Sequence, residues 1–186
     1  RMNRAIRNLG LATIFTAASW VGCVNSATRD DRENEENRER ESIAYKVNDF
    51  SKDSEKVLLA RMIFGEARNC SYDELLAVGF TALNRANDGR RWNGKNVKDS
   101  LLIPLQYSCF NNNDPNRKKL MDPEAFDAYS WSVCLTAAED VLDGSRKEIN
   151  KGQTHYHTPA VHPKWAEKIE PIAFDDYKFR HVFYKE

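Results

Sequence analysis

The sequence has no excess of charge of either sign and no internal repeat. Lys and Arg together number 28, Asp and Glu together also number 28, and the formal net charge is therefore zero. A protein that binds nucleic acid through the phosphate backbone needs a surplus of basic side chains. We therefore expect no nucleic-acid partner.

Cysteines are few, and they lack the spacing of metal-binding motifs. The four lie at positions 23, 70, 109 and 134 without a Cys-x-x-Cys pair, which disfavours a zinc finger. If Cys23 is lipidated or removed, the other three allow at most one disulfide bond within the domain. The sequence does not determine which two cysteines would form it.

Long hydrophobic runs are also missing. The run at 9–24 follows two arginines and is only weakly apolar. It is shorter than the roughly 20 residues of a spanning helix and is typical of a signal peptide. We therefore predict that residues 1–27 are an export signal or a weak membrane anchor. The protein would then act in the periplasm, the cell envelope or outside the cell.

Two cleavage patterns follow this run. Residues 20–23, WVGC, resemble a lipoprotein box with Trp20 where Leu is usual, and Cys23 would then carry a lipid. Residues 25–27, NSA, instead offer small side chains to an ordinary signal peptidase. Both alternatives stay open, and either permits attachment to a membrane.

A charged segment separates this region from the rest of the chain. Residues 29–41, RDDRENEENRERE, contain no apolar side chain and cannot contribute to a core. We predict a disordered tether at 28–49 and a single domain at 50–186, since 186 residues with 41% apolar content suffice for one ordinary core. We expect this domain to be a monomer.

Helical periodicity dominates the first part of the domain. A helix capped by Ser51 or Asp53 would carry one apolar stripe made of Leu58, Leu59, Met62 and Ile63. Glu66 falls on the same stripe, four residues after Met62. Ser71 and Glu74 have the spacing of a capping box and predict the start of a second helix.

The later part changes from helical to strand-like patterns. A short helix is predicted at 97–102, an irregular segment at 104–115, and a long helix from Asp122-Pro123-Glu124 to Gly144. The apolar face of the long helix would consist of Phe126, Tyr129, Val133, Ala137 and Val141. Segments 154–158 and 178–184 are rich in aromatic residues and predict short strands or a hairpin. The expected class is α+β, mainly helical with a small C-terminal β-sheet.

Glu66 is the strongest candidate for chemistry. A carboxyl on an apolar stripe loses solvation of its charged form, which raises its pKa and lets it serve as a general acid. Protonation of a glycosidic oxygen is one reaction that needs such a group. The alternative is an ion pair of Glu66 with Arg61 or Arg68 at the end of the helix.

Several short motifs together resemble one known family. They are Gly65-Glu66-Ala67-Arg68, Thr81-Ala82-Leu83-Asn84-Arg85, Gln106-Tyr107-Ser108-Cys109-Phe110, Thr154-His155-Tyr156-His157, Pro163-Lys164-Trp165 and His181-Val182-Phe183-Tyr184. In this order they resemble the SleB-type cell-wall hydrolase domain of spore cortex-lytic enzymes and phage-encoded relatives. The sequence departs from many relatives at Phe110, where Trp is common, and at Asp175-Asp176-Tyr177, where the relatives contain Gly.

The resemblance implies a lysozyme-like domain that cleaves the glycan strands of peptidoglycan, with Glu66 as catalytic acid and no cofactor. Several members resemble lytic transglycosylases, in which the 6-hydroxyl of the sugar attacks and no second carboxylate is needed. Since no second acid has a comparable apolar setting, a single acid/base is the simpler mechanism, and muramidase-type hydrolysis stays open as the alternative.

Six other residues are candidates for substrate binding. Gln106, Tyr107 and Ser108 fall in the irregular segment and could donate or accept hydrogen bonds with sugar groups. Tyr156 and Trp165 could stack on sugar rings, and His157 could hydrogen-bond to the glycan. The alternative for residues 106–108 is a loop held by its own polar groups, and the alternative for Tyr156 and Trp165 is that they are ordinary core residues.

Two other functions remain as alternatives. His155 and His157 would share one face of a strand and could join His162 and His181 in the zinc site of an amidase. No carboxylate base has a recognised spacing from them, and we expect no metal site. The second alternative is a wall-binding protein that keeps the groove without turnover.

Overall fold

The computed structural model describes Thr28, Arg32 and residues 45–186. The predicted export segment at 1–27, with Cys23, and most of the predicted tether lie outside these residues. Among the described helices, none is both long enough and apolar enough to cross a membrane.

Five α-helices and one small sheet form the described domain. The helices are α2 (Glu55–Ala67), α3 (Tyr72–Asn87), α4 (Val97–Leu102), α5 (Arg117–Met121) and α6 (Pro123–Asp143). Short 3₁₀ turns lie at Phe50–Lys52, Arg91–Asn93, Ser108–Phe110, Lys147–Ile149 and Ala166–Lys168. The strands β1 (His155–His157) and β2 (Val182–Tyr184) pair antiparallel. The prediction of a mainly helical domain with a small C-terminal sheet is confirmed.

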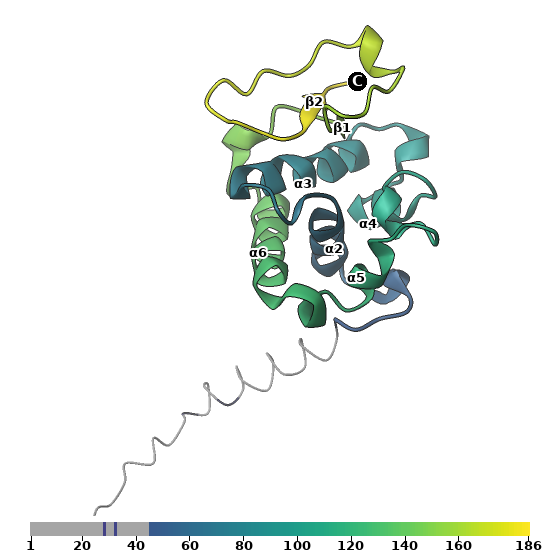
Figure 1. Cartoon of the computed structure of the whole chain (residues 1–186), viewed down its shortest axis with the longest axis vertical. Helices are drawn as coiled ribbons and strands as arrows, with labels where there is room; N and C mark the ends of the chain where they lie inside the picture. The colour runs from purple at the N-terminus through teal and green to yellow at the C-terminus, as the bar shows by residue number, and fades with distance from the viewer. Residues whose placement is uncertain (1–27, 29–31, 33–44) are drawn as a thin grey trace, which may run out of the picture.

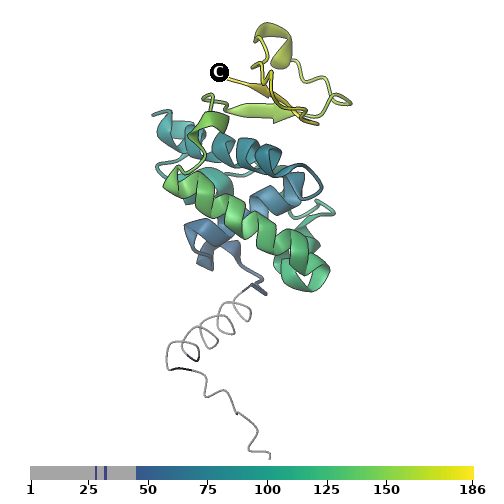
Figure 2. The same ribbon diagram turned by 90° about the vertical axis from the view of Figure 1, so that its left-hand side faces the viewer.

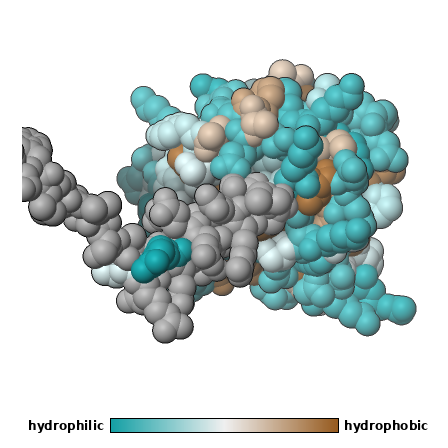
Figure 3. Space-filling view, turned by 90° about the horizontal axis from the view of Figure 1, so that it is seen from below, coloured by the Kyte–Doolittle hydropathy of each residue, from teal (hydrophilic) through white to brown (hydrophobic). Residues whose placement is uncertain are grey.

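The helices surround α2, and the sheet forms a separate layer. In Figure 1, α6 lies on one side of α2, α4 and α5 lie on the other, and α3 crosses between α2 and the sheet. The perpendicular view in Figure 2 shows the same order of layers. On the face opposite the sheet, the visible described residues are mostly hydrophilic with small separate hydrophobic areas (Figure 3). The apolar side chains of the helices therefore point mainly inward.

The central helix α2 is buried on nearly all sides. Its residues 58–65 are all buried, as expected for a helix enclosed by others. The N-cap is Ser54, whose hydroxyl accepts a hydrogen bond from the Val57 amide at 3.3 Å. The predicted caps Ser51 and Asp53 are wrong, because Ser51 lies in the preceding turn and Asp53 is bound to Arg61.

Arg61 is a buried charge that connects three parts of the chain. Its Nε donates to Asp53 Oδ2 at 2.7 Å, its Nη2 donates to the Tyr45 carbonyl at 2.8 Å, and its Nη1 donates to the Leu120 carbonyl. Loss of one partner of such a buried pair costs about 3–5 kcal/mol. Tyr45 is also buried and Val47 packs against the core, so packing starts within the segment that the sequence assigned to the tether.

The first turn of α3 holds the C-terminal layer. Ser71 occupies the N-cap position but makes no side-chain cap hydrogen bond, so the predicted capping box does not form. Glu74 is buried, and its Oε1 instead accepts hydrogen bonds at 2.8 Å from the Arg180 amide, the His181 amide and His181 Nδ1. These bonds attach the chain that enters β2 to the start of α3.

The other end of α3 holds the chain that enters β1. Asn84 Nδ2 donates to the Gln153 carbonyl at 2.8 Å, and Arg85 Nε donates to the Thr154 carbonyl at 2.6 Å. The sheet is therefore fixed to both ends of one helix. Its register pairs Tyr156 with Phe183, and His155 with Tyr184.

The long helix α6 begins and ends as predicted. Asp122 accepts a hydrogen bond from the Ala125 amide, Pro123 is the first residue, and Gly144 ends the helix with φ of 74°. Asp127 is extended, with φ of −160° and ψ of 88°, and this kink changes which face is buried. The predicted face is therefore wrong in its first half, where Phe126 and Tyr129 are 51% and 79% exposed. After the kink, the buried residues are Trp131, Cys134, Ala137, Ala138 and Val141.

The Glu74 contact predicts a specific acid dependence of stability. Burial raises the pKa of Glu74, but the hydrogen bonds and charge of His181 and the Arg180 amide outweigh it, so the pKa lies below its usual 4.5. Because the pKa of this carboxyl is lower in the folded than in the unfolded state, its ionised form stabilises the folded protein at any pH above the unfolded-state pKa. This stabilisation is lost as the pH falls through the folded-state pKa. Glu74→Gln should lower the free energy of unfolding at pH 7 by about 1–3 kcal/mol. The difference from wild type should shrink below about pH 4.5 in urea unfolding, and a constant difference would contradict this role.

Candidate functional site

Glu66 lies in the last turn of α2, next to a tight link into α3. It is half-buried, whereas Met62 and Ile63, on the same stripe, are fully buried. Its Oε1 accepts a hydrogen bond from the Cys109 amide at 3.3 Å. A backbone amide therefore orients the Glu66 carboxylate, and the side chain stays partly exposed at the surface.

The alternative of an ion pair at the helix end is not realised among the described residues. Arg61 pairs with Asp53. Arg68 donates to the Phe64 carbonyl at 3.3 Å, and its guanidinium lies 5.4 Å from the Phe126 ring centroid. Neither arginine forms an ion pair with Glu66, so its charge is not neutralised by them.

Gly65 permits the contact that orients Glu66. A Cβ at this position would lie 2.7 Å from Cys109 Cβ and 3.2 Å from Leu120 Cδ2. With glycine there, the turn at Ser108–Phe110 packs directly on α2. This close approach brings the Cys109 amide to the Glu66 carboxylate.

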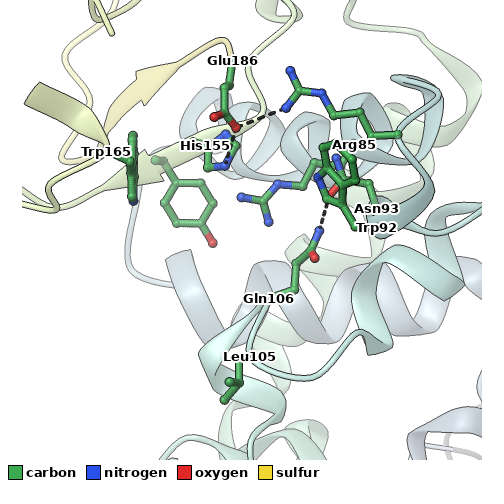
Figure 4. Close-up of a pocket in the computed structure, with 10 residues that line it drawn as sticks. Arg85, Trp92, Asn93, Leu105, Gln106, His155, Trp165 and Glu186 are labelled. Atoms are coloured by element: carbon green, nitrogen blue, oxygen red, sulfur yellow. Dashed lines mark hydrogen bonds and ion pairs between the residues drawn. The ribbon is translucent and has the colours of Figure 1, made fainter. Parts of the chain in front are cut away.

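Three hollows join along one side of the domain, and Glu66 lies where two of them meet. The central hollow, of about 220 Å³, is lined by Glu66, Arg85, Leu105, Gln106, Tyr107, Ser108 and Tyr156. The second, the His181 hollow, of about 290 Å³, shares Glu66 and includes Cys70, Thr158 and His181. The third, the outer hollow, of about 390 Å³, shares Arg85, Leu105, Gln106 and Tyr156 with the central one (Figure 4). We call these three hollows together the groove.

Most of the predicted site residues lie together in this groove. Gln106, Tyr107, Ser108 and Tyr156 line the central hollow beside Glu66. Trp165 lines the outer hollow.

His157 lines none of the three hollows, although its ring contacts Trp165, which lines the outer one. Its Nε2 is 2.9 Å from the Tyr184 hydroxyl, and its ring stacks on Tyr184 at an interplanar angle of 21°. The structure therefore places His157 in the sheet and not beside Glu66.

Arg85, Leu105 and Trp92 line the groove but were missing from the predicted site. Arg85 ends the motif Thr81-Ala82-Leu83-Asn84-Arg85, which resembles the family, so the sequence did contain a pattern that pointed to it. Leu105 is 83% exposed with φ of 68°, a left-handed conformation that is rare for this residue type and cannot be read from sequence. Trp92 is 69% exposed and gave no periodic signal.

Three neighbours of Glu66 keep their protons at ordinary pH. Burial, and then the negative charge of Glu66, raise the pKa of both Cys109 and Tyr156 well above their usual values. Burial also raises the pKa of Tyr107. Among the described residues beside the central hollow, these three are therefore poor proton carriers.

The histidines of the predicted zinc alternative do not gather in the described residues. His155 and His157 both contact the Trp165 ring, with centroids 5.1 and 5.8 Å away, and His181 is bound to Glu74. The potential metal ligands that do lie together at 45–186 are Cys70, Glu74 and His181, within 4.8 Å.

Two of these three groups already bond to each other. Burial and the Glu74 charge raise the pKa of the Cys70 thiol to about 11. Glu74 therefore bonds to both His181 and Cys70 within this group of three side chains.

Cys70, Cys109 and Cys134 all carry free thiols, so the disulfide that the sequence allowed is not present among them.

The close approach at Gly65 predicts coupled mutational effects. Gly65→Ala should lower the free energy of unfolding by about 1–3 kcal/mol, because its Cβ would overlap that of Cys109. Adding Cys109→Gly removes the opposing Cβ and should recover part of this loss in a double-mutant cycle.

Cys109→Ala is the matched control, because it removes the sulfur and keeps the Cβ. It should relieve Gly65→Ala less than Cys109→Gly does, because the contact with the sulfur at 3.0 Å is lost but the closer contact with the Cβ at 2.7 Å stays. Strictly additive effects in urea unfolding for the Gly65→Ala and Cys109→Gly pair would refute the contact.

Most of the chain matches one known family model. The family model described as cell wall hydrolase matches residues 69–184, a segment that begins three residues after Glu66 and contains the other groove residues predicted from sequence. Comparison with curated proteins and comparison with solved structures each find no match. Since the matched segment covers more than half of the 186 residues, the chain belongs to the cell wall hydrolase family.

Proposed function

We propose that this protein cleaves the glycan strands of peptidoglycan, with Glu66 as the general acid and then the base. The observation that carries this proposal is the position of the Glu66 carboxylate where the central and His181 hollows meet. A polymer lying along the groove would pass this carboxylate with room on both sides. Family membership independently supports a cell-wall substrate.

The surroundings of Glu66 favour a lytic transglycosylase over a two-carboxylate hydrolase. Retaining glycosidases need a second carboxyl group about 5–5.5 Å away, and inverting ones need it about 6.5–9.5 Å away. Among the described residues that line the central and His181 hollows, Glu66 is the single acidic side chain. Glu186, in the outer hollow, already pairs with Arg90 at 3.1 Å.

The proposed reaction needs one proton carrier. Protonated Glu66 gives its proton to the glycosidic oxygen as the bond between this oxygen and the anomeric carbon breaks. The 6-hydroxyl of the same sugar then attacks the anomeric carbon, and its proton returns to Glu66. The products are a new 4-hydroxyl end and a 1,6-anhydro end, and no water is consumed.

We assign the domain to the SleB type with a lysozyme-like arrangement, and we place its action outside the cytoplasm, where peptidoglycan lies. The motif order from Gly65 to Tyr184 and the helices around α2 support these assignments. We also propose that it acts as a monomer without a cofactor.

Removal of the proton carrier tests the proposal. Glu66→Gln should reduce clearing of murein in a zymogram by at least about 100-fold, because the amide cannot protonate the leaving oxygen. The matched control is Glu139→Gln, the same change at a surface residue that pairs with Lys56 at 2.9 Å. Both variants should unfold at temperatures close to wild type.

Two outcomes would count against the assignment. Unchanged clearing by Glu66→Gln would remove this residue from the reaction. A wild-type protein that binds murein without clearing it would favour the wall-binding alternative.

Product analysis separates the two cleavage chemistries. Mass spectrometry of digested murein should find 1,6-anhydro ends, which are lighter by one water than reducing ends. Reducing ends would instead indicate hydrolysis and require a second base or an activated water. The same products should be absent from the Glu66→Gln digest.

A further inference from the structure

Arg85 carries an unpaired positive charge at the junction of two hollows. It lines both the central and the outer hollow, and it is half-buried. Among the described residues, no carboxylate lies within ion-pair distance of its guanidinium. In Figure 4 the side chain extends into the space between His155 and Gln106.

The other arginine of the outer hollow differs in this respect. Arg90 Nη1 lies 3.1 Å from Glu186, and Arg90 Nε lies 3.7 Å from Asp88. Its charge is therefore neutralised by the protein itself. Arg85 is left as the uncompensated cation of this part of the groove.

Contacts on two sides hold the Arg85 guanidinium in place. Its Nε donates to the Thr154 carbonyl at 2.6 Å, and its Cζ lies 5.1 Å from the centroid of the Tyr107 ring. The bond to Thr154 uses one of the five N–H donors, and the guanidinium also acts on the Tyr107 hydroxyl, so other terminal N–H groups are left for another partner. A planar guanidinium fixed in this way suits bidentate binding of a carboxylate.

The neighbouring side chains suit a sugar ring. Trp92 is 69% exposed and lines the outer hollow together with Trp165, so both indole rings border its space. Burial, and then the charge of Arg85, lower the pKa of His155, which therefore adds no second cation. The outer hollow thus combines aromatic surfaces with one available positive charge.

We propose that Arg85 binds a carboxylate of the glycan strand in the outer hollow, and so selects acidic muramic strands over neutral amino-sugar polymers. This inference rests on the proposed function, since it names the substrate feature recognised beside Glu66. The carboxylate has two possible sources in peptidoglycan: the lactyl group of a muramic residue without its peptide, or the stem peptide where it is still attached.

Binding measured without turnover tests this inference. In a Glu66→Gln background, dissociation constants would be compared for three strands: peptide-bearing, peptide-free with lactyl carboxylates, and peptide-free with these carboxylates converted to methylamides. Adding Arg85→Gln should weaken binding to at least one acidic strand by about 10-fold or more and leave the methylamide strand within about twofold. The acidic strand affected identifies the source of the carboxylate.

Two further variants separate recognition from a structural effect. Arg85→Lys keeps the charge but loses the planar pair of donors, so it should keep part of the preference for the acidic strand that Arg85→Gln loses. Arg146→Gln is the matched control, because this arginine pairs with Asp73 and Glu148 outside the groove and should bind like the parent.

Equal weakening of all three strands, or no weakening, would overturn the role of Arg85. Failure of the proposed function would be seen separately, as a wild-type protein that never releases cleaved products. The binding comparison needs no cleavage and so remains informative in that case.

Discussion

Glu74 is the buried anion that holds the C-terminal layer on the helical core. Its Oε1 receives three N–H groups from Arg180 and His181, all at 2.8 Å. Because β2 follows directly and pairs with β1, this contact fixes the sheet that carries Tyr156. Without it, this wall of the groove beside Glu66 would be attached to α3 only through the bonds that Asn84 and Arg85 donate to the chain before β1. The groove therefore depends on a carboxylate that does not line it.

The opposite wall depends on the close packing at Gly65. The missing side chain lets the Ser108–Phe110 turn approach α2, and the Cys109 amide then binds Glu66. The catalytic candidate is thus oriented by a backbone donor, which cannot titrate. The same approach places Gln106, Tyr107 and Ser108 at the rim of the central hollow. The close packing at Gly65 and the hydrogen bond from the Cys109 amide to Glu66 therefore depend on each other.

Local patterns predicted much of the fold. The stripe of α2, the Asp122 and Gly144 ends of α6 and the two C-terminal strands follow from periodicity and capping, which act within a few residues. The predictions that were wrong depended on contacts from elsewhere in the chain. The Asp53 carboxylate binds Arg61 and the Glu74 carboxylate binds His181, so neither side chain takes its predicted role at the start of an α-helix. The kink at Asp127 changes which face of α6 is buried.

The order of elements, the position of Glu66 near the end of an apolar helix and the motif order that resembles cell-wall hydrolases can all be predicted from the sequence. The residues that surround the Glu66 carboxylate follow from the packing of distant segments. This packing brought Gln106 and Tyr156 to one hollow with Glu66, left His157 in the sheet, and added Arg85 as an unpaired cation. The physical reason is separation along the chain. Glu74 and His181 are 107 residues apart, and hydrogen bonds over such distances leave no periodic signal in the sequence.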